Sequence, residues 1–461
     1  MLALVIGILV IILVLWYVGR KSTVYDNIYF DNNGTTQPHK EVVQEMAVGA
    51  WLGNASSSYA LEAKNKIDEL RSAILKWCRA DHHKVIITSG ASEANNLILR
   101  SMVDYYWRTS PVSGRGITEK PHIIVSSIEH KSILECAKLL SEEGRVSVSY
   151  ISPDIYGNID LKDINAAMNA RTILISIMSA NNELGNKLPV EEIADMAAAR
   201  GIAFHTDAVQ TFGKFQPNMK NMAALSMSFH KMNGPQGIGV LVLDNELAAK
   251  IKGQIAGSHN FGLRGGTENM PAICGALKAM EITLADRVKK NQHMLDMKRR
   301  IVENLSKEFS LIPCANLANK TDEAALELVS KPVEGSVIRD YKPRAPKGLV
   351  ILGPTKSGLP DEDLTNPNTL LLSVINLRNN ANPYERFCNI KFKSDLATEH
   401  AIVSIGSACQ TGEVGPSHVL KEINAPFIVR CGVIRISLGD YNNMGQVDSF
   451  CKKFVKCAWL Q

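Results

Sequence analysis

The chain has 461 residues, of which 45% are hydrophobic and 21% are charged. This composition is ordinary for a globular protein of two or three domains, and it excludes a largely disordered or fibrous chain. The 51 Lys and Arg residues against 46 Asp and Glu give a net charge of +5 without a long basic run, so nucleic acid is not an expected partner. The nine cysteines are scattered without a C-x-x-C pair, which indicates reduced thiols rather than a disulfide framework or a metal site.

The first 18 residues contain no charged side chain. Eighteen helical residues span roughly 27 Å, which is close to the hydrocarbon thickness of a bilayer. Arg20 and Lys21 follow, and by the positive-inside rule they would leave the rest of the chain in the cytosol. We therefore expect a transmembrane anchor over residues 1–19 and a single-pass membrane protein whose main part is cytosolic. A cleaved signal peptide would need a basic leading region and a small-residue cleavage site, and the segment has neither.

From about residue 84 onward, short apolar runs alternate with segments of helical spacing. Such alternation predicts a mostly parallel sheet with helices on its faces. The expected strands are Val85–Thr88, Ile123–Ser126, Val146–Ile151, Ile173–Met178, Ile202–Thr206, Leu225–Phe229 and Ile238–Leu243. The expected helices include Ala94–Tyr105, Ser132–Leu140 and Val190–Ala199.

The last third of the chain departs from this alternation. Residues 331–368 carry six prolines with several glycines and charges, which predicts a loop or an insertion rather than a core element. Three apolar runs and an amphipathic C-terminal segment follow, and they predict a smaller α+β domain. The expected division is a large α/β domain over 28–290, of which 28–40 packs with the small domain, and a small domain over 291–461.

Ligands of a mostly parallel sheet bind beyond the carboxyl ends of its strands. Residues 89–92, Ser-Gly-Ala-Ser between a strand and a helix, would place N–H groups and a hydroxyl where a phosphate binds, although Ser92 serves equally well as a helix N-cap. Asp207 ends a buried strand and needs a cationic partner, either a pyridinium nitrogen or a structural salt bridge. Lys231 follows another strand, as a surface residue or as a Schiff-base lysine with a lowered pKa. Taken together, these features match the binding of pyridoxal phosphate (PLP).

Ten segments stand in the order found in one known family. They are Tyr29–Thr36, Thr88–Asn96, Ile128–His130, Asn181–Gly185, His205–Gln210, Ser228–Lys231, Gly262–Asn269, Gly406–Cys409, Pro416–Leu420 and Arg435–Gly439. On these segments the chain resembles the NifS-like cysteine desulfurases of the class V aminotransferase superfamily. The resemblance implies an α/β fold of the PLP-dependent transferase type (aspartate aminotransferase-like, fold type I), with a smaller α+β domain and, in this chain, the N-terminal membrane helix.

The resemblance also implies a role for each matching residue. Lys231 would bind PLP covalently and later move the substrate Cα proton, while His130 would stack on the cofactor ring and assist proton transfer. Arg435 would clamp the substrate carboxylate in a bidentate pair, which a lysine could not reproduce. Thr267 would reach the phosphate of the other subunit, which implies a homodimer. The remaining contacts would be Asp207 on the pyridinium nitrogen, Gln210 on the ring hydroxyl, Asn181 on cofactor and substrate, and Ala91, Ser92, Ser228 and His230 around the phosphate.

Cys409 points to one reaction within the superfamily. It lies in a polar, glycine-bearing stretch that has little to pack and is expected to be mobile. Its thiolate would attack the sulfur of bound L-cysteine, giving L-alanine and a Cys409 persulfide for an acceptor or scaffold protein in iron–sulfur cluster assembly or thiolation. The alternatives are a selenocysteine lyase or another class V PLP enzyme, and an inactive membrane-tethered scaffold on the same fold.

The chain departs from the family pattern close to the expected site. Gly34 stands where the family usually has alanine, and residues 256–261 replace a glycine-rich stretch. The main catalytic positions are unaffected. The departures therefore bear on substrate contacts, rate and acceptor choice.

Overall fold

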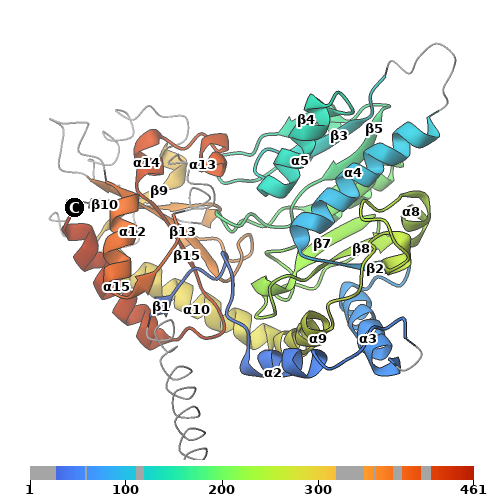
Figure 1. The fold of residues 1–461 in the computed structure, drawn as a ribbon. Coiled ribbons are helices and arrows are strands. Elements are labelled where there is room, and N and C mark those ends of the chain that lie inside the picture. The colour runs from blue at the N-terminus through green and yellow to red at the C-terminus, as the bar shows by residue number, and fades with distance from the viewer. Residues whose placement is uncertain are drawn as a thin grey trace, which may run out of the picture.

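The computed structural model describes residues 27–57, 60–110, 119–317, 347–356, 359–376, 387–405 and 417–461. Within these residues a seven-stranded sheet and a four-stranded sheet lie side by side, each covered by helices (Figure 1). This is the α/β arrangement that the alternation of strands and helices predicts.

The larger sheet has the strand order β2-β8-β7-β6-β5-β3-β4. Its strands are β2 (His83–Thr88), β3 (His122–Ser126), β4 (Ser147–Ile151), β5 (Thr172–Ser176), β6 (Ala203–Asp207), β7 (Ala224–Ser228) and β8 (Gly239–Asp244). β8 is antiparallel to both of its neighbours, and the pairs from β7 to β4 are parallel. All seven predicted strands are therefore present within two residues of their expected ends, and the mostly parallel sheet is confirmed.

Both faces of the larger sheet are buried, because its strands carry apolar residues on both sides. Ile123 and Val125 of β3 belong to one hydrophobic cluster, whereas Ile124 belongs to another. Helices α4, α5 and α8 contribute to the first cluster, and α3, α6, α7 and α9 to the second. Their bounds are α3 (Leu61–Cys78), α4 (Ala91–Thr109), α5 (Lys131–Glu142), α6 (Leu161–Ala167), α7 (Val190–Ala198), α8 (Asn245–Lys250) and α9 (Met270–Ala285).

The smaller sheet has the order β15-β13-β10-β9, with a helical layer on each face. Its strands are β9 (Ser310–Pro313), β10 (Lys347–Leu352), β13 (Thr369–Asn376) and β15 (Val433–Ser437). The helices are α10 (Arg287–Ser306), α12 (Asn389–Thr398) and α15 (Met444–Trp459) on one face, and α13 (His418–Glu422) and α14 (Phe427–Cys431) on the other. The remaining short elements are η2 (Phe229–Lys231), η3 (Asn260–Gly262), η4 (Cys314–Leu317), β11 (Thr355–Lys356) and β12 (Leu359–Pro360).

The stretch 331–368, expected to be a loop or an insertion, contains a core strand. β10 lies inside the smaller sheet, parallel to β9 and antiparallel to β13. All six of its residues are buried. The prolines and glycines on either side of this short apolar run favour turns. The local composition of the stretch therefore predicts a loop and does not reveal the strand.

The first described residues connect the two sheets. β1 (Ile28–Tyr29) pairs with β14 (Ala401–Ile402), and Phe30 belongs to the hydrophobic cluster of the smaller sheet. The chain then passes residues 31–36 and enters α2 (Lys40–Gly49), which packs against α9 below the larger sheet (Figure 1). Residues 31–36 are thereby held at the junction of the two sheets.

The prediction of a transmembrane anchor, and with it of a single-pass membrane protein, does not hold. Among the residues that the structure describes, no helix combines the length and the apolar character needed to cross a bilayer. The predicted segment 1–19 itself lies outside the described residues. Eighteen apolar residues reach only the lower limit of a membrane span, so hydropathy alone was a weak basis for the prediction.

Candidate active site

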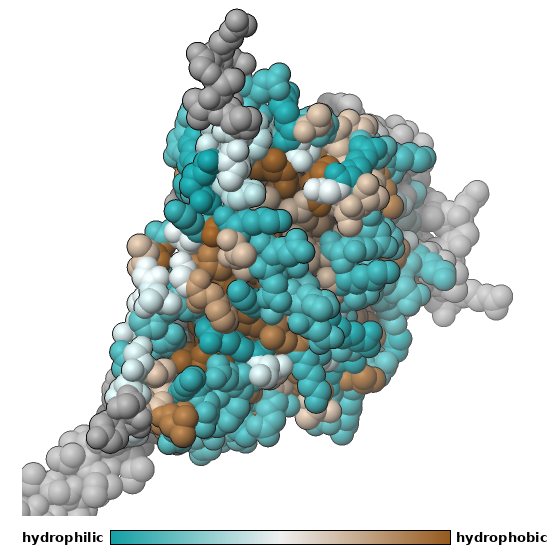
Figure 2. Space-filling view, turned by 90° about the vertical axis from the view of Figure 1, so that its right-hand side faces the viewer, coloured by the Kyte–Doolittle hydropathy of each residue, from teal (hydrophilic) through white to brown (hydrophobic). Residues whose placement is uncertain are grey.

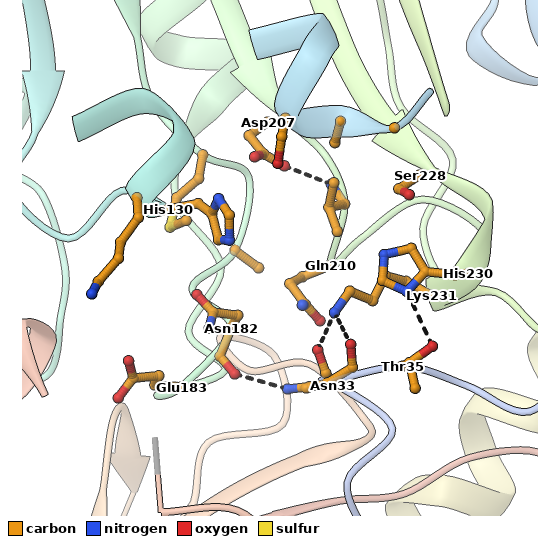
Figure 3. A pocket seen from close by; sticks show the side chains of 18 of the residues that line it. Asn33, Thr35, His130, Asn182, Glu183, Asp207, Gln210, Ser228, His230 and Lys231 are labelled. Carbon is orange, nitrogen blue, oxygen red and sulfur yellow. Dashed lines mark hydrogen bonds between the residues drawn. The ribbon is translucent and has the colours of Figure 1, made fainter. Parts of the chain in front are cut away.

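A cavity of about 700 Å³ opens where the two sheets meet. Its lining includes residues at the carboxyl ends of β2, β6 and β7 in the larger sheet, together with Asp31, residues 33–35 and, from the smaller sheet, Arg435. Figure 3 shows the side chains of these segments converging on one space. The position beyond the carboxyl ends of parallel strands is the one expected for a ligand site in such a sheet.

One end of the cavity is formed by the start of α4. Gly90 is the N-cap, and no side chain among the described residues caps this helix terminus. Ala91 and Ser92 line the cavity here, and Ser228 and His230 line it from the end of β7. Gly239 allows the close approach, because a Cβ at this position would lie 2.7 Å from the Gly90 backbone. Uncapped N–H groups, two hydroxyls and an imidazole form a suitable cradle for a phosphate.

The His230 ring is neutral at physiological pH. Burial, assisted by the nearby Lys231, lowers the pKa of His230 to about 4. Its Nδ1 lies 3.1 Å from the Thr35 hydroxyl. A neutral imidazole at the cradle can still donate one N–H to an anion, and it adds no fixed charge.

A hydrogen-bonded chain links Asp207, the last residue of β6, to His130. The Asn95 side-chain amide donates to Asp207 Oδ2 at 2.8 Å and to Ser132 Oγ at 2.9 Å. His130 Nδ1 accepts from the Ser132 backbone N–H at 3.2 Å and lies 2.8 Å from Ser132 Oγ. Because Nδ1 is an acceptor, the neutral His130 ring carries its proton on Nε2. Burial lowers the pKa of His130 and thereby favours this neutral form.

Lys231 lies at the centre of the cavity, in the short helix η2. Its Nζ donates to the backbone carbonyl oxygens of Asn33 and Gly34, both at 2.5 Å (Figure 3). Burial, and then the charge of Arg435, lower the pKa of Lys231 to about 7. The amine can therefore accept and release a proton near neutral pH, as a general base must.

Arg435 of β15 lines the cavity from the smaller sheet. Its Nη2 donates to Asp31 Oδ1 at 2.7 Å, and its Nη1 donates to the Asn182 carbonyl oxygen at 3.1 Å. The Arg435 side chain is only 6% exposed, so its charge depends on this anionic partner. A buried arginine beside an open cavity suits the recognition of a carboxylate.

The residues at the cradle and around Lys231 fit PLP. Asp207 is 5% exposed and lines the cavity. Within the part of the chain that the structure describes, its carboxylate accepts hydrogen bonds from two neutral groups, the Asn95 amide and the Val209 N–H. Gln210 Oε1 is buried without a hydrogen-bond partner among the described residues, and Gln210 also lines the cavity. A cationic ring nitrogen would satisfy the carboxylate, and a ring hydroxyl would satisfy the orphaned amide oxygen.

Two residues expected at the site do not line the cavity. The Asn181 amide donates to the Ile128 carbonyl and accepts from the Glu183 and Leu184 N–H groups, so it holds the backbone. Its neighbour Asn182 lines the cavity instead. Thr267 is exposed and lies 3.5 Å from the Asn54 amide, outside the cavity of its own chain.

Cys409 lies outside the described residues, but both flanks of its segment reach the cavity. Ser404 and His418 line the cavity, and Ser404 exchanges backbone hydrogen bonds with Arg435. Cys409 follows Ser404 by five residues, a reach of at most roughly 18 Å.

The sequence alone gives no function to several residues that the structure places at the site. Asp31, Asn33 and Gly34 stand in the first family segment, and Asn95 stands in the second, so the motif signal was present. The sequence does not reveal their functions, because these depend on tertiary contacts. Asp31 acts through an ion pair, Asn33 and Gly34 through their backbone carbonyl oxygens, and Asn95 through a side-chain amide that bridges two residues. The sequence does not single out Asn182, because two adjacent asparagines offer no local signal for which one faces the ligand.

The sequence profile of the class-V aminotransferase family matches residues 28–341. The cysteine desulfurase IscS of Clostridium botulinum is 30% identical over 428 residues, which cover 91% of each chain. The cysteine desulfurase IscS of Dictyoglomus turgidum is 31% identical over 421 residues, or 90% of each chain. Among solved structures, a NifS-like protein superposes with a TM-score of 0.73 at 27% identity, over 94% of this chain and 100% of that chain. SspA, solved in complex with cysteine, superposes with a TM-score of 0.67 at 26% identity, over 90% of this chain and 100% of that chain.

The fold is that of the PLP-dependent aminotransferases, and the cavity suits their cofactor. The chain belongs to the class-V aminotransferase family, within which it is NifS-like. The resemblance that rested on ten sequence segments is thereby confirmed.

Proposed function

We propose that Lys231 and Cys409 carry the reaction of this chain, which is a PLP-dependent cysteine desulfurase. The observation that carries the proposal is the meeting, in one cavity, of Lys231, Asp207 and Arg435 with both flanks of the Cys409 segment. Such a cavity offers a cofactor site, a carboxylate site and access for a thiol. L-Cysteine is the substrate.

Bound PLP supplies an electron sink that stabilises negative charge at the substrate Cα. In this proposal Asp207 holds the ring nitrogen, and Gln210 holds the ring hydroxyl. Ser92, Ser228, His230 and the Ala91 N–H hold the phosphate. The hydrogen bonds through Asn95 and Ser132 hold the Asp207 carboxylate and the His130 ring in a fixed position relative to each other. These contacts are made before substrate arrives, so the site is preorganised.

Lys231 moves the proton. With a pKa lowered to about 7, its Nζ takes the Cα proton at neutral pH and returns it to the substrate skeleton. Arg435 orients the substrate through its α-carboxylate. His130, which holds its own proton on Nε2, faces the same cavity and assists the transfer.

Cys409 takes the sulfur. Its thiolate attacks the substrate sulfur and forms an S–S bond while the Cβ–S bond breaks. The electron pair of the broken bond stays with the carbon fragment, which takes up a proton and leaves as L-alanine. The sum is L-cysteine plus the Cys409 thiol giving L-alanine plus the Cys409 persulfide, which needs no external oxidant or reductant.

The persulfide is passed to an acceptor or scaffold protein, and iron–sulfur cluster assembly is the use that the family supports. A homodimer completes the site, with Thr267 contributing to the phosphate site of the partner. Thr267 is exposed, and exposed apolar residues lie nearby on and around α2 and α3, among them Trp51, which is 90% exposed. Figure 2 shows the side that carries α3, where hydrophobic residues lie open among hydrophilic ones.

The test is Cys409→Ser in the PLP-loaded protein, with Cys388→Ser as the matched control because Cys388 is an exposed free cysteine. With L-cysteine and a thiol reductant, we expect Cys409→Ser to lose sulfide and L-alanine formation by about 10²-fold or more, because the nucleophile is absent. Cys388→Ser should keep both, and mass spectrometry should find the persulfide on Cys409 of the wild type. Undiminished sulfide release by Cys409→Ser would refute the assignment, and pyruvate or another keto acid as the product would favour a different class V reaction.

A further inference from the structure

The ion pair between Arg435 and Asp31 is unequal in its burial. The Arg435 side chain is 6% exposed, whereas the Asp31 side chain is 26% exposed. Both residues line the cavity. The carboxylate is therefore on the solvent side of the pair, where a ligand entering the cavity meets it.

Asp31 is the anionic partner of Arg435, which is the role that a substrate carboxylate would take. It contacts the guanidinium through a single hydrogen bond, from Nη2 to Oδ1. Nη1 is turned to a backbone carbonyl, and Nε is buried without a hydrogen-bond partner among the described residues. Arg435 thus has unused donor capacity, and a ligand carboxylate that binds in a bidentate manner would satisfy more of it than Asp31 does.

The loop that carries Asp31 is fixed by its backbone rather than by the ion pair. The Gly34 and Thr35 N–H groups donate to the Asp31 carbonyl oxygen at 2.9 and 3.4 Å. The Tyr29 hydroxyl donates to the Thr35 carbonyl oxygen at 2.9 Å. The Asp31 side chain can therefore release Arg435 without unfolding the loop.

Gly34 leaves room for the Asp31 carboxylate in this position. A Cβ added at Gly34 would lie 2.9 Å from Asp31 Oδ2 and 3.1 Å from Asp31 Cγ. Such contacts are too short, so an alanine at position 34, which the family pattern usually has, would push the carboxylate away. The pairing geometry is thus linked to a residue in which this chain departs from that pattern.

We propose that Asp31 is an internal counter-ion of Arg435 that the α-carboxylate of the substrate displaces, and that Gly34 permits this competition. The inference rests on the proposed function for the identity of the substrate. Asp31 neutralises the buried guanidinium while the site is empty and weakens the binding of every carboxylate ligand. It also disfavours ligands that cannot offer a bidentate carboxylate in exchange.

The test compares Asp31→Asn with the wild type in the PLP-loaded protein. The KM for L-cysteine comes from sulfide release, and the Kd of L-alanine comes from calorimetry. Removing one charge-assisted competitor should lower both constants roughly tenfold, with a smaller change in kcat. Gly34→Ala, which moves the carboxylate but keeps its charge, should lower both in the same direction by a smaller factor. Asp163→Asn, an exposed carboxylate of α6, is the control and should change neither.

The outcomes separate the inference from the proposed function. If Asp31→Asn raises both constants, Asp31 aligns Arg435 rather than competing with the ligand, and the inference fails. Unchanged constants, or no L-alanine binding to either protein, also overturn it. A wild type that binds L-alanine but releases no sulfide would refute the proposed function alone, since the calorimetric comparison still reports on Asp31. If Asp31→Asn does not fold, the same two constants measured for Gly34→Ala test the inference.

Discussion

The two ends of the cavity are built in different ways. At the cofactor end, Asp207 ends β6, and Lys231 follows the neighbouring strand β7 of the same sheet, 24 positions further along the chain. At the substrate end, Arg435 and Asp31 are 404 positions apart and come from segments joined through the smaller sheet. The first end depends on local strand–turn geometry, and the second depends on the docking of distant segments.

This difference has a functional consequence. At the cofactor end, neutral hydrogen bonds from Asn95 and Ser132 hold the Asp207 carboxylate and the His130 ring. Lys231 has to release only its hydrogen bonds to two backbone carbonyl oxygens before the cofactor is bound. At the substrate end, an ion pair already occupies the guanidinium. We therefore expect changes at the cofactor end to act on kcat and changes at the substrate end to act on KM.

Lys231→Ala should have the largest effect. It removes the proton carrier and the covalent attachment point together, and we expect L-alanine formation from L-cysteine to fall by about 10³-fold or more. The measurement is turnover by the PLP-supplemented protein, with borohydride treatment and mass spectrometry to detect attached cofactor. The exposed Lys162 serves as the control, as Lys162→Ala. Turnover above a few per cent of the wild-type value would contradict the role of Lys231.

Arg435→Lys should have an intermediate effect of a different kind. A lysine keeps the charge but loses the planar fork, so we expect the KM for L-cysteine to rise roughly 10- to 100-fold, with a smaller loss in kcat. Steady-state kinetics across a wide substrate range separates the two constants. A collapse of kcat at unchanged KM would break the proposed division between the two ends.

Glu129→Gln should have the smallest effect, and the effect should depend on pH. Complete burial raises the pKa of Glu129 from 4.5 to about 8, although hydrogen bonds from Ser126 and the Met178 N–H oppose the shift. Between these two pH values the folded protein holds a proton that the unfolded chain releases. The free energy of unfolding therefore falls as pH rises from about 4.5 to 8, and this contribution is fully present only below that window.

Glutamine is neutral at every pH and removes this dependence. We expect the stability of Glu129→Gln, relative to wild type, to be greater at pH 8 than at pH 5 by on the order of 1–3 kcal/mol. Urea unfolding of both proteins at the two pH values measures the difference. An equal difference at both values would show that the pKa of Glu129 is not raised in the folded protein.

Much of the architecture follows from the sequence. The seven strands of the larger sheet are short apolar runs, and the polar residues that follow them are adjacent in the chain to the strands that place them. Their position beyond the sheet edge follows from strand direction alone. For the same reason the sequence alone predicts that Asp207, Ser228, His230 and Lys231 lie together at one edge of the sheet.

Other features were decided only by tertiary structure. The pairing of Arg435 with Asp31 joins opposite ends of the chain, and no local pattern encodes such a contact. β10 is a core strand because β9 and β13 flank it, even though its neighbourhood is rich in proline and glycine. Asn182 rather than Asn181 faces the cavity because the Asn181 amide is taken up by the backbone. Sequence periodicity reports what a residue does within its own element, whereas these three features depend on which elements pack together.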